Sequence, residues 1–157
     1  MMKRIPPIKS TEILCKGNIE NHFEMMPLDL FNYLELGLIS HADFTVYMKL
    51  TQFYNKDLGY AFPNIPQLMI YTNIKSKTTI NNSLNNLIAA GLLQKGKGTK
   101  GNNIYRTFKP LDREELHKLV PKMVQALQER KIQLLQGNTS DKVRWEAFKQ
   151  EKVNHQG

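Results

Sequence analysis

Apolar positions in the first half of the chain recur with the spacing of α-helices. Residues 28–36 fit a short helix, and residues 22–27 before it fit a short strand. Ser40 and Asp43 are spaced as a capping box at the start of a longer segment, 40–54. Apolar side chains in that segment return every three or four residues, so we expect a helix buried over much of its surface.

A short strand at residues 59–62 and a second helix at 65–72 are expected next. Asn64 is placed to cap this helix. Asn73 then interrupts the pattern, and asparagine enters the left-handed backbone region more readily than most residues. We therefore expect a tight turn at Asn73.

The segment after this turn fits a polar helix with one apolar face. Ser76 is a good N-cap for a helix over 76–90, and Gly91 is placed to end it. The apolar face is formed by Ile80, Leu84, Leu87 and Ile88. Many of the other positions are Asn, a poor helix former, which favours a binding surface over a merely solvated face.

A β-hairpin is expected after this helix. Residues 92–94 and 104–108 fit strands, and the connector KGKGTKGNN between them has three glycines and three lysines. We therefore expect a long, flexible, basic tip that carries Lys95, Lys97 and Lys100.

The composition changes after the hairpin. Asp112 and Glu115 are spaced as a capping box, so a helix is expected to begin there. Pro121 should break or kink this helix, and a second stretch should run to about residue 135. The sequence GNTSD, 137–141, fits a cap or a linker before a last amphipathic turn or two.

The whole chain has a formal net charge of +8, and most of this positive charge is concentrated in one segment. Residues 61–110 carry seven Lys or Arg side chains and no Asp or Glu, whereas the flanking segments mix both signs. An ordinary solvated surface also mixes both signs. An acid-free segment of this length therefore indicates a polyanionic partner.

The segment LMIYTNIKSKTTI, with the leucine-bearing helix and GLL after it, resembles the pattern of winged helix-turn-helix proteins. That pattern occurs in multiple-antibiotic-resistance-type regulators and in replication proteins of Gram-positive plasmids and phages. The stretch SHADFTVYMKLTQFYNKDLGYAFPNIPQL is similar to the replication-associated group, in which a GxxFP strand precedes the second helix. Met69 and Asn73 depart from the usual Ala and Gly.

The element order and this resemblance imply an α+β fold, mainly α with a small β-hairpin wing and additional carboxyl-terminal helices. They imply an amino-terminal arm at 1–21, a winged helix-turn-helix domain at 22–110 and a helical extension at 111–157. The extension either packs on the domain or joins two copies. We favour a homodimer, because regulators of this architecture often place two recognition helices on neighbouring half-sites.

The expected partner is double-stranded DNA, with the helix in the major groove and the wing on the backbone. Asn and Thr side chains favour sites rich in A·T pairs. The expected contacts from the recognition helix and its entry are Lys75, Ser76, Lys77, Thr78, Thr79, Asn82, Asn85 and Asn86. Those from the wing are Lys95, Lys97, Lys100, Asn102, Asn103 and Arg106.

Other kinds of site fit the sequence poorly. Residues 91–97 begin like a phosphate-binding loop, but Gly98 stands where Ser or Thr should hold magnesium. The four histidines and Cys15 are dispersed without metal-ligand spacing. We therefore expect no catalytic residue, metal, cofactor, small-molecule effector or enzyme activity. The lone cysteine and the lack of a long apolar run favour a cytoplasmic protein without a membrane segment.

Three functions fit these expectations. The first is a sequence-specific transcriptional regulator of a bacterial plasmid, phage or other mobile element. The second is a replication-initiation or conjugation accessory protein that binds origin DNA. The third is a protein-interaction module, which the acid-free segment disfavours.

Overall fold

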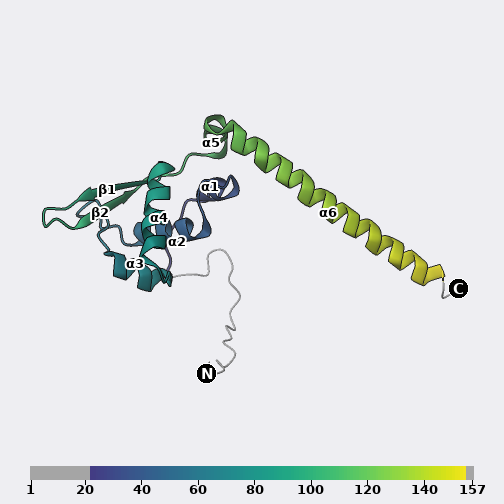
Figure 1. Ribbon diagram of the computed structural model, residues 1–157, viewed down its shortest axis with the longest axis horizontal. Helices are drawn as coiled ribbons and strands as arrows, with labels where there is room; N and C mark the ends of the chain where they lie inside the picture. Colours follow the sequence, from purple (N-terminus) through teal and green to yellow (C-terminus); the bar gives the residue numbers. More distant parts are fainter. Residues whose placement is uncertain (1–21, 155–157) are drawn as a thin grey trace, which may run out of the picture.

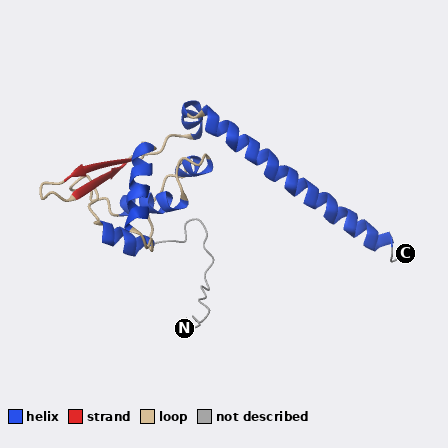
Figure 2. Ribbon diagram, in the orientation of Figure 1, coloured by secondary structure: helices blue, strands red, loops and turns tan. Residues whose placement is uncertain are grey.

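The computed structural model describes the backbone of residues 22–154 and the side chains of all of these except 138–141 and 154. The predicted arm at 1–21 lies outside the described residues. The described part is mainly α with one hairpin and additional carboxyl-terminal helices, as predicted (Figures 1 and 2). Its elements are α1 (Leu30–Glu35), α2 (His41–Gln52), α3 (Ile65–Thr72), α4 (Lys77–Ala89), β1 (Leu93–Lys97), β2 (Asn103–Thr107), α5 (Arg113–Leu119) and α6 (Pro121–Asn154).

Polar side chains start the domain's helices where the sequence predicts. At α2, Ser40 Oγ accepts from the Asp43 N–H at 3.2 Å, and Asp43 Oδ2 accepts from the Ser40 N–H at 2.8 Å. At α3, Asn64 Oδ1 accepts from the Gln67 N–H at 2.8 Å, and Gln67 Oε1 accepts from the Asn64 N–H at 2.9 Å. Each box satisfies two groups that a helix end leaves without backbone partners, which fixes where the helix begins.

The turn between α3 and α4 sets the angle at which these helices cross. Asn73 has a φ of 55°, in the left-handed region, as predicted. Ser76 Oγ accepts from the Thr79 N–H at 3.3 Å and caps α4. Leu68 of α3 and Ile80 of α4 are both fully buried. The predicted helix-turn-helix arrangement is thereby confirmed.

The core lies between α2 and α4, which pack closely together. On α4 the buried positions are Ile80, Ser83, Leu84 and Leu87. Ile88 was expected in this face, but its side chain is 40% exposed. It is rotated by about 100° from Leu87, which carries it past the edge of the buried stripe.

The wing has a longer first strand and a shorter tip than the sequence predicts, and its second strand is shifted by one residue. In the antiparallel register Leu93 lies opposite Thr107, and Lys97 lies opposite Asn103. The turn is closed by a 2.8 Å bond from the Gly98 N–H to the Asn102 carbonyl. Backbone pairing therefore outweighs the weak strand preference of the glycine-rich segment. Lys95 and Lys97 consequently belong to β1 and not to a flexible tip.

Two predicted strands do not form as regular strands. Residues 22–27 have no regular secondary structure. Residues 59–62 form only isolated bridges, in which Tyr60 pairs with Asn55 and Ala61 pairs with Tyr105. A strand requires a hydrogen-bonded neighbour, and the sheet of the described part consists of β1 and β2 alone.

The chain that leaves the wing is fixed to the domain by two buried tyrosines. The Tyr47 hydroxyl donates to the Phe108 carbonyl at 2.7 Å, and the Leu111 N–H donates to the Tyr33 hydroxyl oxygen at 3.0 Å. Leu116 of α5 is buried in the core. These contacts hold α5 against α1.

Helix α6 departs furthest from the prediction. Asp112 caps α5 and Pro121 begins a new helix, both as predicted. However, α6 continues for 34 residues, through the segment 137–141 that was expected to be a cap or linker. One glycine inside a helix costs about 1 kcal/mol, which the good helix formers on both sides offset. The helix runs away from the domain as a straight rod (Figure 1).

Candidate nucleic-acid interface

The face of α4 that points away from the core carries small polar side chains. Thr78, Asn82 and Asn85 are exposed and lie opposite the buried stripe of Ile80 and Leu84. The other residues expected on this helix and at its entry are exposed as well: Lys75, Ser76, Lys77, Thr79 and Asn86. The described surface of α4 contains no carboxylate.

Asn81 belongs to the same exposed face but was not among the expected contacts. It lies four residues after Lys77 and four before Asn85, so the three side chains form one row along α4. Its helical spacing from Lys77 was the signal available in the sequence.

Two of the residues expected on α4 and at its entry have structural bonds of their own. Ser76 caps α4. Asn86 Nδ2 donates to Asp43 Oδ2 at 3.3 Å, and Asp43 is a buried residue of α2. The Asn86 amide is therefore directed toward the scaffold, whereas the Asn82 and Asn85 side chains have no such bond.

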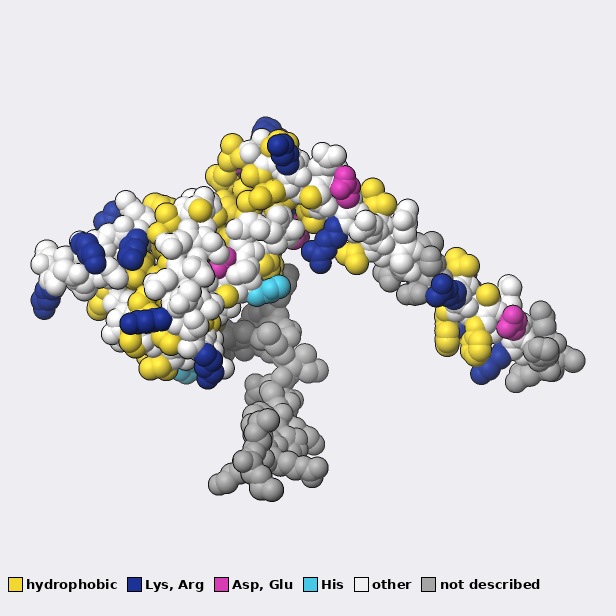
Figure 3. Space-filling model, in the orientation of Figure 1, with side chains coloured by type: hydrophobic (Ala, Val, Ile, Leu, Met, Phe, Trp, Pro, Cys, Tyr) yellow, Lys and Arg dark blue, Asp and Glu magenta, His cyan; other side chains and the backbone are white. Residues whose placement is uncertain are grey.

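The wing presents its cations from a rigid ladder. Lys97 Nζ donates to Asn103 Oδ1 at 2.8 Å, across the β1–β2 pair. Arg106 Nε donates to the Gly59 carbonyl at 3.2 Å, which ties β2 to the segment before α3. Lys95 and Lys100 are exposed. In the space-filling view basic side chains gather on the wing and on the neighbouring helices (Figure 3).

A groove of about 360 Å³ joins the wing to the beginnings of α3 and α4. Its polar walls include Asn64, Lys77, Lys97, Asn102 and Asn103. The structure thus brings residues from the two predicted sets, helix and wing, to one concave surface. Helix starts carry partial positive charge, so two of them beside two lysines make this groove attractive to anions.

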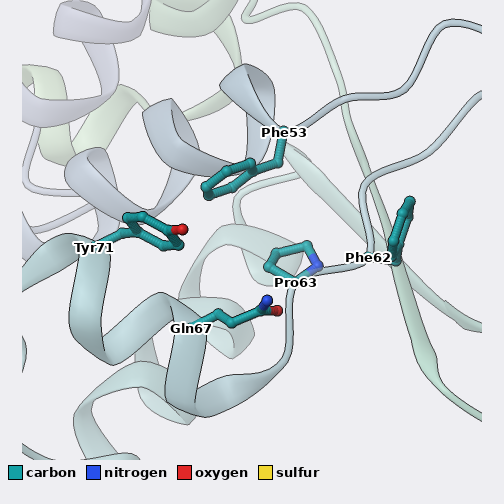
Figure 4. A pocket seen from close by; sticks show the side chains of 5 residues that line it. All are labelled: Phe53, Phe62, Pro63, Gln67 and Tyr71. Carbon is teal, nitrogen blue, oxygen red and sulfur yellow. The ribbon is translucent and has the colours of Figure 1, made fainter.

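A second, aromatic hollow of about 130 Å³ lies beside α3 and shares Phe62 and Pro63 with the groove. It is lined by Phe53, Phe62, Pro63, Gln67 and Tyr71, which surround the opening in Figure 4. The Phe53 and Tyr71 ring centroids are 5.0 Å apart, and Lys49 Nζ lies 5.8 Å from the Tyr71 ring. The sequence pattern did not predict this hollow, because its walls come from segments whose approach depends on the tertiary fold.

Two tyrosines under the interface are held in a low-polarity environment. Burial raises the pKa of Tyr105, which lies in β2, and the pKa of Tyr47, which supports the exit of the wing.

Among residues 22–154, no cluster of three His, Cys, Asp or Glu side chains could hold a metal ion. No helix of that described part is long and apolar enough to cross a membrane.

Comparison with known proteins identifies the same fold. Residues 36–93 match the family model of a helix-turn-helix domain. That segment contains α2, α3 and α4 and ends at β1, and the β1–β2 hairpin then adds a wing. The described part of the chain therefore has a winged helix-turn-helix fold, with the helix-turn-helix domain at residues 36–93.

Three solved structures are similar to this chain at low sequence identity. One is the N-terminal domain of a DNA-binding protein, with 18% identity over 73% of this chain and 96% of that chain and a TM-score of 0.46. Another is a possible transcriptional regulator from Methanosarcina mazei Go1, with 16% identity, 75% and 93% coverage and a TM-score of 0.40. A third comes from a Rep–DNA complex, with 20% identity, 71% and 95% coverage and a TM-score of 0.42. No curated protein matches the chain.

Proposed function

We propose that this protein binds double-stranded DNA at specific sequences, with α4 in the major groove and the wing against the phosphate backbone. The observation that carries the proposal is the continuous acid-free surface formed by the exposed face of α4, the groove and the wing. Every cation on such a surface attracts a polyanion, and no carboxylate on it repels one.

The two parts of this surface have different tasks. Asn82 and Asn85 present amides that can bond the edge of adenine, and Thr78 can contact phosphate or a thymine methyl group. The wing carries charge instead, and Lys95, Lys97 and Lys100 neutralise phosphates whatever the base sequence. Affinity then comes mainly from the wing and sequence preference from α4.

Fluorescence anisotropy on labelled duplexes separates these tasks once a site has been selected from random DNA. Affinity should fall with salt at a log–log slope of about −0.9 per phosphate neutralised. Lys97→Ala should weaken all duplexes alike and reduce the slope by about 1. Asn82→Ala and Thr78→Ala should reduce discrimination against altered bases, which for a good contact amounts to about 1–3 kcal/mol.

Lys122→Ala, an exposed lysine at the start of α6, is the matched control and should leave binding unchanged. A flat salt response would overturn the proposal of DNA binding. An unchanged site preference in Asn82→Ala and Asn85→Ala would remove α4 from the reading role while leaving backbone binding intact.

The biological role that we propose is transcriptional regulation on a bacterial plasmid, phage or other mobile element, by a cytoplasmic homodimer. Replication initiation or conjugation at origin DNA is the second candidate. It is favoured by the GYAFP segment at 59–63, which places Phe62 and Pro63 on the groove wall. Footprinting on the neighbouring DNA of its own genome distinguishes the two, because a regulator protects a promoter and an origin-binding protein protects repeats.

A further inference from the structure

Helix α6 carries an apolar stripe that the domain does not cover. Leu134, Trp145 and Phe148 fall within about 60° of one another around the helix at 100° per residue. Their side chains are 61%, 58% and 47% exposed. Val124 and Leu127, nearer the start of α6, pack against the core instead. Helices owe most of their stability to packing of an apolar face, so the distal half of α6 needs a partner.

The distal stripe is also basic. The Trp145 and Phe148 rings stack with centroids 5.8 Å apart. Lys149 Nζ lies 5.5 Å from the Trp145 ring centre, and Lys152 Nζ lies 5.2 Å from that of Phe148. Glu146 and Glu151 are rotated by roughly 90° or more from the centre of the stripe, whereas Asp141 occupies a position one turn before Trp145 on the same side of the helix. The surface is therefore apolar with cations over its two rings.

A complementary surface lies along the amino-terminal side of the domain. We call it the acidic strip and define it as Phe23, Glu24, Met25, Leu28, Asp29 and Phe31. Its four apolar side chains are 56%, 88%, 80% and 48% exposed in that order. The sequence has no Lys or Arg between Lys16 and Lys49. A groove of about 530 Å³ begins beside Phe23 and Glu24 and is bounded by Met48.

The stripe cannot reach the acidic strip of its own chain. Trp145 lies 24 residues beyond Pro121, which is about 36 Å along a straight helix. The strip runs into α1, and α1 contacts α5 at the near end of α6. Helix α6 points away from that region (Figure 1). A contact between the two surfaces is therefore a contact between two chains.

We propose that the distal stripe of α6 docks on the acidic strip of a second copy, and that the exchange is reciprocal. The acidic strip offers Glu24 and Asp29 to Lys149 and Lys152, and its exposed apolar side chains match the apolar rings of the stripe. Two-fold symmetry closes the assembly, because each copy gives one stripe and receives another. The two α6 helices then run in opposite directions, since each begins beside its own strip and ends on its partner's.

This inference deepens the proposed homodimer and is independent of DNA binding. It places the two domains near opposite ends of a helix pair on the order of 50 Å long. The dimer would accordingly engage two well-separated DNA sites, not half-sites one helical turn apart.

A charge exchange in the full-length protein tests the pairing. Lys149→Glu/Lys152→Glu and Glu24→Lys/Asp29→Lys should each weaken dimerisation by about tenfold in light scattering or analytical ultracentrifugation, because like charges then face each other. The chain that carries all four changes should regain dimerisation. Lys56→Glu/Lys122→Glu is the matched control and should dimerise normally. A monomeric wild-type protein, or four changes that weaken dimerisation further, would overturn the proposal.

A photoreactive phenylalanine analogue in place of Phe148 locates the contact directly. Mixing isotope-labelled and unlabelled chains distinguishes cross-links between chains from those within one chain. The expected cross-links join residue 148 to residues 23–31 of the other chain. Cross-links to α6 of the other chain, to residues 1–21, or within one chain would overturn the inference. Affinity for a short single-site duplex, measured on the same charge variants, reports separately on the proposed DNA binding and should not change.

Discussion

Asp43 connects the start of α2 to the back of the candidate recognition helix, and replacing it should show how far the fold fixes α4. The carboxylate is 1% exposed. One of its oxygens accepts from the Ser40 N–H at 2.8 Å and from Asn86 Nδ2 at 3.3 Å. Asp43→Ala removes both bonds and half of the capping box.

The expected loss of stability follows from these bonds. Loss of a cap costs about 0.5–2 kcal/mol, and a buried donor left without a partner costs about 1–3 kcal/mol. The Ser40 N–H can turn partly to water, so we expect about 2–3 kcal/mol in total for Asp43→Ala. At about 2–4 °C per kcal/mol for a chain of this size, the melting temperature should fall by roughly 4–12 °C. Ser40→Ala, which removes only the Ser40 Oγ acceptor, should cost about 1 kcal/mol.

Urea unfolding followed by circular dichroism measures these differences, and a double-mutant cycle of Asp43→Ala with Asn86→Ala isolates the link to α4. We expect a coupling energy of about 0.5–1 kcal/mol, because the joining bond is long but partly buried. Asp43→Asn keeps one acceptor oxygen and should lie between wild type and Asp43→Ala. A coupling near zero, with Asp43→Ala no worse than Ser40→Ala, would refute the reasoning and return Asn86 to the DNA-reading set.

Three further measurements test other parts of the fold. Tyr47→Phe should lower the free energy of unfolding by about 1 kcal/mol by removing the hydroxyl bond to the Phe108 carbonyl; no change in urea unfolding would mean that water replaces this bond fully. Burial raises the pKa of Tyr47 and Tyr105 above the ordinary 10.0. Their contribution to stability should therefore be complete below pH 10 and fall as the pH rises through the folded-state values, and a stability curve flat from pH 9 to 11 would contradict this. Asn73→Ala should cost about 1 kcal/mol at a φ of 55° while Asn73→Gly is nearly neutral, and equal thermal shifts for the two would exclude backbone strain as the cause.

The local signals that fixed helix starts were the most informative part of the sequence. Ser40, Asn64, Ser76 and Asp112 each cap the helix that the sequence predicts after them. A capping side chain and the backbone N–H that it bonds lie within four residues of each other, so the local sequence contains both partners. The left-handed turn at Asn73 was predictable for the same reason.

Features that depend on a distant partner were less predictable. Lys95 and Lys97 form a strand because β2 pairs with them, although glycines on either side favour a loop. The segment 137–141 has the composition of a helix cap, yet it continues α6. In both places the local preference is only about 1 kcal/mol, which neighbouring turns or a paired strand can outweigh.

The candidate interface shows the same division on a finer scale. A helical wheel identifies the face of α4 opposite Ile80 and Leu84 and treats every polar residue on it alike. Packing then distinguishes them, because Asn86 bonds the buried Asp43 and Ser76 caps the helix. Recognition of the DNA base sequence should therefore depend on the α4 side chains that have no structural bond, which are Thr78, Asn81, Asn82 and Asn85. A selected DNA site whose preferences survive Asn86→Ala but are lost in Asn82→Ala and Asn85→Ala would match this division.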